Sequence, residues 1–315
     1  MKKIFISLAS YRDPMLFFTL ESAYSHAVHP ENIVFGIVDQ NEVNQRHEME
    51  KLPFFAQIRY CHLYPEDTLG VSWARSIAYS LYNDEEYILQ IDSHTCFEEG
   101  WDENLIDQLN EQKNVSLKPI ITTYPYPFTF DEKRPKYNKP EGKTVLVLRP
   151  KPDQILSKEN PILTFRAEHL FTDTPVLGCH IAGGFFFCEG QFVEEIPYDP
   201  YMYFHGEEQN LSLRAFTRGW DIYHPKWIPL YHLYKEANQP HDTHHWYGEV
   251  LSKRDFDSSL LRSRAQARLK KLISGELGES AYGLGSVRSL DDFALLSGIN
   301  YSHAIIKDVH GGLLR

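Results

Sequence analysis

The chain has 315 residues, of which 42% are hydrophobic and 24% are charged, so general disorder is excluded and a large core can form without disulfide bonds. The formal net charge of −11 argues against nucleic acid as a partner, because surfaces that follow a phosphate backbone usually carry a basic excess. A phosphate-bearing small molecule remains compatible with this charge, since a bound metal ion can supply positive charge locally.

The first part of the chain alternates short apolar runs with helical patterns. Residues 3–9 have the signature of a buried strand, and Pro14 can open a helix that extends to about Ala27. A helix is predicted at residues 71–82, and further strands are predicted at Ile33–Val38, Ile58–Leu63 and Glu86–Ile91. This alternation predicts an α/β fold, with a Rossmann-like, mostly parallel sheet flanked by helices.

The middle of the chain is less regular. Residues 124–162 are rich in Pro, Lys, Tyr and Asp, and we expect an irregular excursion or a hairpin there, suited to a lid or an acceptor loop. An apolar, glycine-rich run follows at residues 178–187. A helix is then predicted at Glu207–Arg218, with Gly219 as its C-terminal cap.

The C-terminal part has a different composition. A basic amphipathic helix is predicted at residues 262–271 and a second short helix at residues 289–297. We therefore divide the chain into a main domain, residues 1–254, and a small helical extension, residues 255–315. The basic helix is expected to be a solvated face, and contact with anionic membrane lipids is the alternative.

The cysteines and the first residues bear on location. The four cysteines are widely spaced and form no CxxC pair, which is typical of reduced thiols rather than of a zinc site or a disulfide framework. The apolar run at residues 3–9 is too short for a signal peptide or a membrane span. Together these features favour a cytoplasmic protein.

Polar residues follow three of the predicted strands. Ser10, Tyr11 and Arg12 follow the first, Asp39 follows the second, and Asp92–His94 follow the strand at Glu86–Ile91. In mostly parallel sheets ligands bind beyond the carboxyl ends of the strands, so these residues are expected to share a site.

Asp92 and His94 are the first candidate metal ligands. Two positions apart on an extended chain, their side chains point the same way and can reach one cation. A carboxylate with an imidazole suits Mn²⁺ better than Ca²⁺, which prefers oxygen ligands alone. The alternative is an aspartate that caps a turn beside a surface histidine.

Two further groups of residues are candidates for the same site. Gly183 and Gly184 let the backbone approach a ligand, while Glu207 and Glu208 lie at a helix start, one as a cap and the other as an acceptor for sugar hydroxyls. His232 follows an apolar stretch and is a candidate third metal ligand. The histidines at positions 241, 244 and 245 indicate either a second metal site or, as we favour, a solvated polar loop.

Several motifs, in this order, resemble one known family. The chain is similar to the Skp1-hydroxyproline N-acetylglucosaminyltransferase family and, more remotely, to the polypeptide GalNAc-transferases. The resemblance covers most of the chain and rests on these segments: Ser10–Asp13, Gln90–His94, Gly100–Asp102, Gly183–Gly184, Tyr198–Pro200, Gly206–Glu208, His232–Tyr234 and Leu284–Leu290.

The resemblance implies a retaining GT-A glycosyltransferase that uses a UDP-sugar, UDP-GlcNAc first, with Mn²⁺ or Mg²⁺. By the same resemblance, Asp92, His94 and His232 bind the metal that bridges the diphosphate. Ser10, Tyr11, Arg12 and Asp39 are implied to hold uridine, and Arg75 is implied to contact the nucleotide or donor sugar. The sugar pocket is implied to be shaped by Gly183 and Gly184 with Glu207 or Glu208, and these two glutamates are the candidate catalytic residues.

The acceptor and two rival functions stay open. The hydroxyl acceptor is expected on a protein or a surface saccharide, because no second domain for reading a protein substrate is recognisable. A metal-dependent nucleotide-sugar hydrolase is one rival. A non-catalytic saccharide- or protein-binding module on the same fold is the other.

Overall fold

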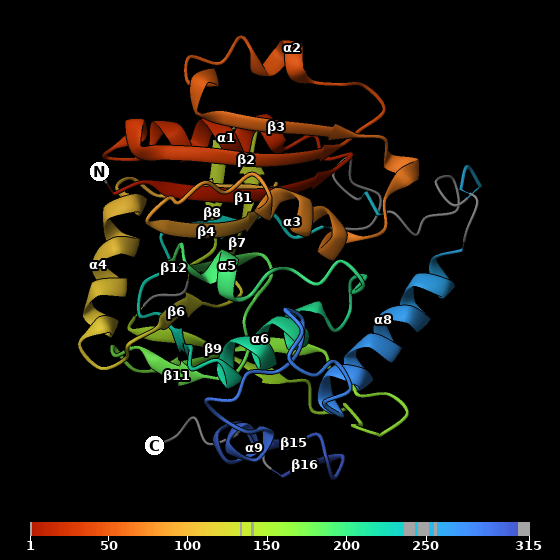
Figure 1. Ribbon diagram of the computed structural model, residues 1–315. Coiled ribbons are helices and arrows are strands. Elements are labelled where there is room, and N and C mark those ends of the chain that lie inside the picture. The colour runs from red at the N-terminus through yellow and green to blue at the C-terminus, as the bar shows by residue number, and fades with distance from the viewer. Residues whose placement is uncertain are drawn as a thin grey trace.

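The computed structural model describes residues 2–132, 134–139, 142–235, 243–244, 252–254 and 257–307. Its centre is an eight-stranded sheet in the order β11-β13-β6-β12-β4-β1-β2-β3, of which Figure 1 labels every strand except β13. The strands are β1 (Ile4–Tyr11), β2 (Ile33–Gln40), β3 (Ile58–Leu63), β4 (Tyr87–Asp92), β6 (Pro119–Thr122), β11 (Val176–Gly178), β12 (Phe185–Glu189) and β13 (Asp221–His224).

Most of this sheet is parallel, as predicted. The pairs β1–β2, β1–β4, β2–β3 and β6–β13 are parallel, whereas β12 is antiparallel to β4 and β6, and β11 is antiparallel to β13. The continuous apolar runs of β1 and β2 are buried on both faces, as strands covered by helices on each side require.

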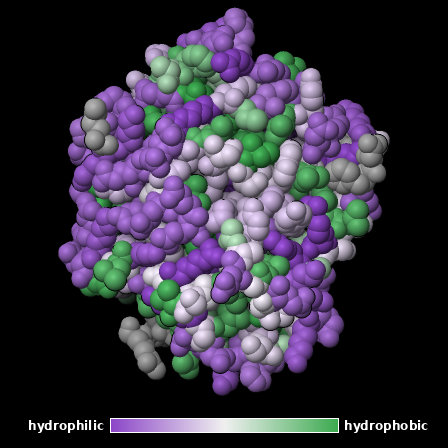
Figure 2. Space-filling model, viewed as in Figure 1, coloured by the Kyte–Doolittle hydropathy of each residue, from purple (hydrophilic) through white to green (hydrophobic). Residues whose placement is uncertain are grey.

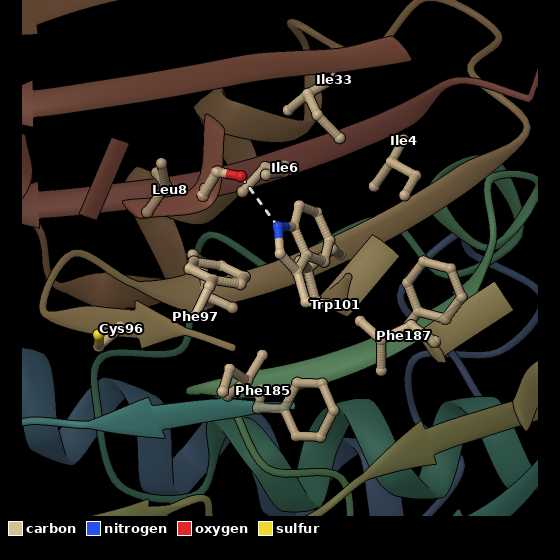
Figure 3. Close-up of a cluster of buried hydrophobic side chains, with 14 of the residues drawn as sticks. Ile4, Ile6, Leu8, Ile33, Cys96, Phe97, Trp101, Phe185 and Phe187 are labelled. Carbon is tan, nitrogen blue, oxygen red and sulfur yellow. Dashed lines mark hydrogen bonds between the residues drawn. The ribbon is translucent and has the colours of Figure 1, made fainter. Parts of the chain in front are cut away.

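Helices cover both faces of the sheet. On one face, α1 (Leu16–Ser25) and α4 (Trp101–Lys113) pack against the side chains of β1 that include Ile6 and Leu8. Figure 3 shows the centre of this layer, where Trp101 is fully buried and its Nε1 donates to a backbone carbonyl of α1, that of Ala23, over 2.9 Å. On the other face, α3 (Val71–Tyr79) and α6 (Glu207–Thr217) pack against Phe5 and its neighbours.

Five short helical elements among the described residues connect the strands and longer helices of this part of the fold. They are α2 (Arg46–Met49), α5 (Phe192–Glu195) and the 3₁₀ turns η1 (Pro30–Asn32), η2 (Phe55–Gln57) and η3 (Pro65–Asp67).

A second sheet meets the first beside the end of β4. Its order is β5-β14-β7-β8, formed by β5 (Thr95–Phe97), β14 (Leu230–His232), β7 (Tyr126–Asp131) and β8 (Arg134–Tyr137). A separate hairpin pairs β9 (Thr144–Pro150) with β10 (Phe165–Phe171). The segment 124–162 contains three strands. β7 and β8 form an antiparallel pair in which Tyr126 and Phe128 are buried, and nearly all of β9 is buried.

The described residues 257–307, part of the predicted C-terminal extension, pack against α6. They contain α8 (Ser258–Ile273), α9 (Leu290–Ser297) and the two-residue strands β15 (Ile299–Asn300) and β16 (Ile305–Ile306). Their apolar residues, among them Leu269 and Phe293, share one core with Leu213 and Phe216 of α6.

Part of the basic face of α8 makes internal contacts. The guanidinium groups of Arg264 and Arg268 lie 5.5 and 5.1 Å from the ring centre of Tyr201, and Arg268 also pairs with the buried Asp199 over 2.7 Å. Hydrophilic residues cover most of the face seen in Figure 2, and hydrophobic residues appear there in several separate groups. Among the described residues, no helix is both long enough and apolar enough to cross a membrane.

Candidate active site

A cleft of about 320 Å³ opens at the carboxyl ends of the parallel strands. Its walls come from the ends of β1, β2 and β4, the first turn of α3, and the segment after β14. The described residues that line it are Ala9, Tyr11, Asp13, Gln40, Thr68, Gly70, Val71, Asp92, Ser93, His94, Phe204, His232, Lys235, Thr243 and His244.

Three candidate metal ligands meet on one wall of this cleft. Asp92 ends β4, His94 follows two residues later, and His232 ends β14. The antiparallel pairing of β14 with β5 sets His232 opposite Thr95, which explains how a residue 140 positions away reaches Asp92. One side-chain atom from each of the three lies within 4.8 Å of the other two.

Hydrogen bonds fix the carboxylate of Asp92 in this group. Its Oδ2 lies 3.1 Å from Nε2 of His232 and 4.0 Å from Nε2 of His94, and its Oδ1 accepts a 2.8 Å bond from Arg75. Burial opposes ionisation of Asp92, but the contacts with His232 and Arg75 outweigh burial and hold its pKa below the usual range. Burial and the nearby His94 lower the pKa of His232, which favours the neutral imidazole that a metal requires.

This donor set fits a borderline divalent cation. One carboxylate and two imidazoles are ligands that Mn²⁺ accepts, and the ring centres of His94 and His232 lie only 4.5 Å apart. Gly184 leaves the space beside them open: a Cβ at that position would lie 2.7 Å from Oδ2 of Asp92 and 3.8 Å from the ring of His232. Any larger residue would therefore crowd the carboxylate.

Arg75 lies behind the ligands rather than on the cleft wall. It is 3% exposed, and besides Asp92 it contacts Glu207 over 2.6 Å and the hydroxyl of Tyr198 over 3.2 Å. The contacts in the structure are thus to two protein carboxylates and a tyrosine hydroxyl. Gly183 makes this arrangement possible, since a Cβ there would lie 2.4 Å from Nη1 of Arg75.

The two glutamates at the start of α6 have different environments. Glu207 is buried, and its second oxygen accepts a bond from Ser72 over 2.8 Å. Burial raises the pKa of Glu207 to about 7, although Arg75 and Ser72 both favour its charged form.

Glu208 is more open, with its side chain 26% exposed. It accepts bonds from the hydroxyl of Tyr124 and the backbone N–H of Gly183, both over 2.7 Å, and contacts His180 over 3.1 Å. Burial opposes its ionisation, but the contacts with His180 and Gly183 outweigh burial and lower its pKa.

Of the residues predicted at the end of β1 and β2, one reaches the cleft directly. Tyr11 lines it, whereas Ser10 and Asp39 are fully buried beneath it. Asp39 accepts a 2.8 Å bond from the hydroxyl of Tyr60, and burial raises its pKa. Arg12 adopts a left-handed backbone, with φ of 47°, and pairs with Glu42 over 2.8 Å.

Among the polar residues of this cleft, Gln40 and Asp13 received no role from the sequence. Gln40 is 3% exposed, its Nε2 donates to the carbonyl of Ser10 over 3.2 Å, and its Oε1 is a buried acceptor without a donor in the described structure. Asp13 also lines the cleft and bonds to His94. Both follow residues that were singled out, so the strand-end position was a usable signal for each.

The histidine-rich segment is only partly described. Positions 241, 242, 245 and 246 lie outside the described residues. The second metal site and the solvated polar loop therefore both stay predictions from the sequence. His244 lines the cleft, and the hydroxyl of Thr243 donates to the backbone carbonyl of Tyr11 over 3.0 Å.

Comparison with known proteins places this geometry in context. A family model described as "Glycosyltransferase (GlcNAc)" matches residues 3–52 and 41–303. A search of curated proteins gives no match. Among solved structures, the fold is similar to that of GalNAc-T7 with UDP, GalNAc and Mn²⁺, at 14% identity and a TM-score of 0.60, covering 93% of this chain and 54% of that one.

Two structures of the S. aureus protein TarS, residues 1–349, are also similar. The first has 11% identity and a TM-score of 0.47, covering 73% of this chain and 60% of that one. The second, in complex with UDP-GlcNAc, has 11% identity and a TM-score of 0.46, covering 87% and 72%. The present chain thus spans about half the length of the GalNAc-T7 chain that it matches.

Proposed function

This chain belongs to the GlcNAc glycosyltransferase family, and from that membership we propose that it transfers a sugar from a UDP-sugar, with UDP-GlcNAc favoured, to a hydroxyl acceptor. The observation that carries the proposal is the cluster of Asp92, His94 and His232 on the wall of the cleft. Further support comes from the similarly folded GalNAc-T7, whose structure contains UDP, GalNAc and Mn²⁺.

The proposed metal is Mn²⁺ or Mg²⁺, held by Asp92, His94 and His232. When bound, such an ion stabilises the negative charge that grows on the diphosphate as the sugar leaves. The protein prepares for this by keeping Asp92 ionised through Arg75 and by keeping His232 neutral through burial. The positive charge of the ion would also offset the repulsion between a diphosphate and a protein of net charge −11.

The end of β2 is the proposed position of the uracil base. Uracil presents one N–H donor between two carbonyl acceptors, and the unpartnered Oε1 of Gln40 is a buried acceptor that such a donor would satisfy. Tyr11 on the same wall offers an aromatic ring. Ser10, Arg12 and Asp39 then support this wall from beneath or beside it.

Glu207 and Glu208 take different proposed roles. The bonds of Glu207 to Arg75 and Ser72 suit a group that holds the ligands in place. Glu208 is partly exposed next to the Gly183–Gly184 turn, so we assign it to the sugar hydroxyls. Neither is proposed as a covalent nucleophile, which agrees with the retaining, same-face reaction that the family resemblance implies.

The acceptor is proposed to be a hydroxyl group on a protein or a surface saccharide.

The proposed location is the cytoplasm. The four free cysteines, three of them buried, support this reducing location.

Calorimetric titration of UDP tests the proposal. In the presence of Mn²⁺ the unmodified protein should bind UDP, and EDTA should abolish binding. Asp92→Ala should bind at least ~100-fold more weakly, since a metal ligand is gone. UDP binding of equal strength with EDTA and with Mn²⁺ would count against a metal-bridged diphosphate.

A further inference from the structure

His94 has a buried partner at Nδ1, on the opposite side of its ring from the Nε2 that faces Asp92. Its Nδ1 lies 2.6 Å from Oδ2 of Asp13, and the same oxygen accepts a 2.7 Å bond from the hydroxyl of Ser93. Asp13 is only 6% exposed.

The contacts of Asp13 indicate which nitrogen of His94 carries the proton. Its carboxylate oxygens accept bonds from Ser93 and from the N–H of Met15, so the same group accepts from His94 as well; Nδ1 is then the donor and Nε2 keeps the lone pair. This nitrogen is the one that faces Oδ2 of Asp92, 4.0 Å away. The contact with Asp13 therefore presents the ring to the cation in the tautomer that can bind it.

His232 offers an internal comparison. Its Nε2 also faces Asp92, at 3.1 Å, but its Nδ1 is buried and has no hydrogen-bond partner within the described residues. Of the two histidine ligands, only His94 thus has a carboxylate partner at Nδ1, the nitrogen on the far side of the ring from Asp92. Asp13 is the residue that makes this difference.

The backbone shows how Asp13 is held. The left-handed conformation of Arg12 turns the chain sharply after β1, and the N–H of Arg12 donates to the carbonyl of Gln40 over 2.9 Å. The second oxygen of Asp13 accepts a 2.9 Å bond from the N–H of Met15, just before α1. Both carboxylate oxygens are therefore engaged by the protein, which suits a support for a ligand better than a ligand.

We propose that Asp13 is a positioning residue for His94: it orients the ring and fixes the Nδ1–H tautomer, so that Nε2 is ready for the cation. The proposal rests on the metal site of the proposed function. In Asp13→Asn, the oxygen that remains can keep the bond to Met15, and the amide nitrogen then faces Nδ1. The ring is driven to the other tautomer, with a proton on Nε2 where the cation should bind.

The test combines metal affinity with the state of the ring. Mn²⁺ binding, followed by electron paramagnetic resonance, should be ~10- to 100-fold weaker in Asp13→Asn than in the unmodified protein. ¹⁵N NMR of the metal-free proteins should find the Nδ1–H tautomer of His94 in the unmodified protein and lose it in the variant. The NMR measurement on the unmodified protein needs no substitution.

A matched control separates positioning from general support of the fold. Asp102 is equally buried, at 2% exposure, and accepts the backbone N–H groups of Val28 and His29 over 2.8 and 2.9 Å. It is absent from the cleft lining, so Asp102→Asn should bind Mn²⁺ like the unmodified protein.

Four results would overturn the inference. An Nε2–H tautomer in the unmodified protein would contradict its premise, and normal Mn²⁺ binding by Asp13→Asn would contradict its consequence. Equal weakening by Asp13→Asn and Asp102→Asn would reduce the effect to general destabilisation. If the unmodified protein itself bound no Mn²⁺, the metal of the proposed function would fall, and the inference with it.

Discussion

Arg75 has two candidate roles, as a contact to the donor and as the partner of buried carboxylates. Replacing it by methionine distinguishes them. The sequence places Arg75 at the nucleotide or donor sugar, whereas in the structure its guanidinium contacts Asp92, Glu207 and Tyr198. Arg75→Met keeps much of the side-chain volume but removes the cation between two carboxylates. Breaking a buried ion pair by removing one partner costs about 3–5 kcal/mol.

The expected shift in Tm follows from the size of the chain. An unfolding entropy of roughly 2.1 cal/mol/K per residue amounts, for 315 residues, to about 0.7 kcal/mol per kelvin. Arg75→Met should therefore lower Tm by about 4–7 °C. Thermal unfolding followed by circular dichroism, in EDTA and without nucleotide, isolates this effect from any ligand. Adding Glu207→Gln should recover part of the loss, because one of the two unpaired carboxylates is then neutral.

An unchanged Tm would contradict this role of Arg75. A variant that unfolds within about 1 °C of the unmodified protein, yet binds UDP much more weakly, would make Arg75 a ligand contact. The reasoning from its buried partners would then be wrong.

Two further predictions concern the metal wall and the core. Gly184→Ala should reduce transfer by about 100-fold and weaken Mn²⁺ binding, because its Cβ would lie 2.7 Å from Oδ2 of Asp92; unchanged Mn²⁺ binding, measured by electron paramagnetic resonance, would contradict this. Burial lowers the pKa of His224 to about 4, so the stability that its neutral ring provides is present above pH ~6.5 and lost as the pH falls towards 4, by about 3 kcal/mol. Urea unfolding of His224→Gln at pH 7 and pH 4 should show a correspondingly smaller loss, and an equal loss would show that other groups cause the acid sensitivity.

The main sheet was predictable because its signal is local. The strands β1, β2 and β4 are buried apolar runs, β3 is a partly buried edge strand, and the predicted ranges of all four overlap the observed ones. The position of Asp92 at the end of β4 followed from the same pattern. Parallel strands bring their carboxyl ends together, so a site at that edge could be inferred without coordinates.

The second sheet was harder to predict because its strands pair over long sequence separations. Much of β7 and β8 is exposed, which leaves little apolar periodicity to detect, and β14 joins β5 from more than a hundred residues away. That pairing is what brings His232 to Asp92.

The partners of buried charges were also beyond a local reading. Arg75 and Glu207 are 132 positions apart, and nothing near either residue indicates the other. Gln40 could not be distinguished by residue type, because the charged Asp39 beside it is the more usual ligand contact; in the structure Asp39 is fully buried and Gln40 lines the cleft.

The central claim is metal-dependent transfer from a UDP-sugar, and UDP release from a panel of UDP-sugars tests it most directly. With Mn²⁺ and a hydroxyl acceptor such as a simple sugar, the unmodified protein should release UDP from one preferred donor, expected to be UDP-GlcNAc. EDTA should stop the release, and Asp92→Ala should slow it by about 10²- to 10³-fold. Release that is equally fast with EDTA, or that is unchanged in Asp92→Ala, would contradict the account.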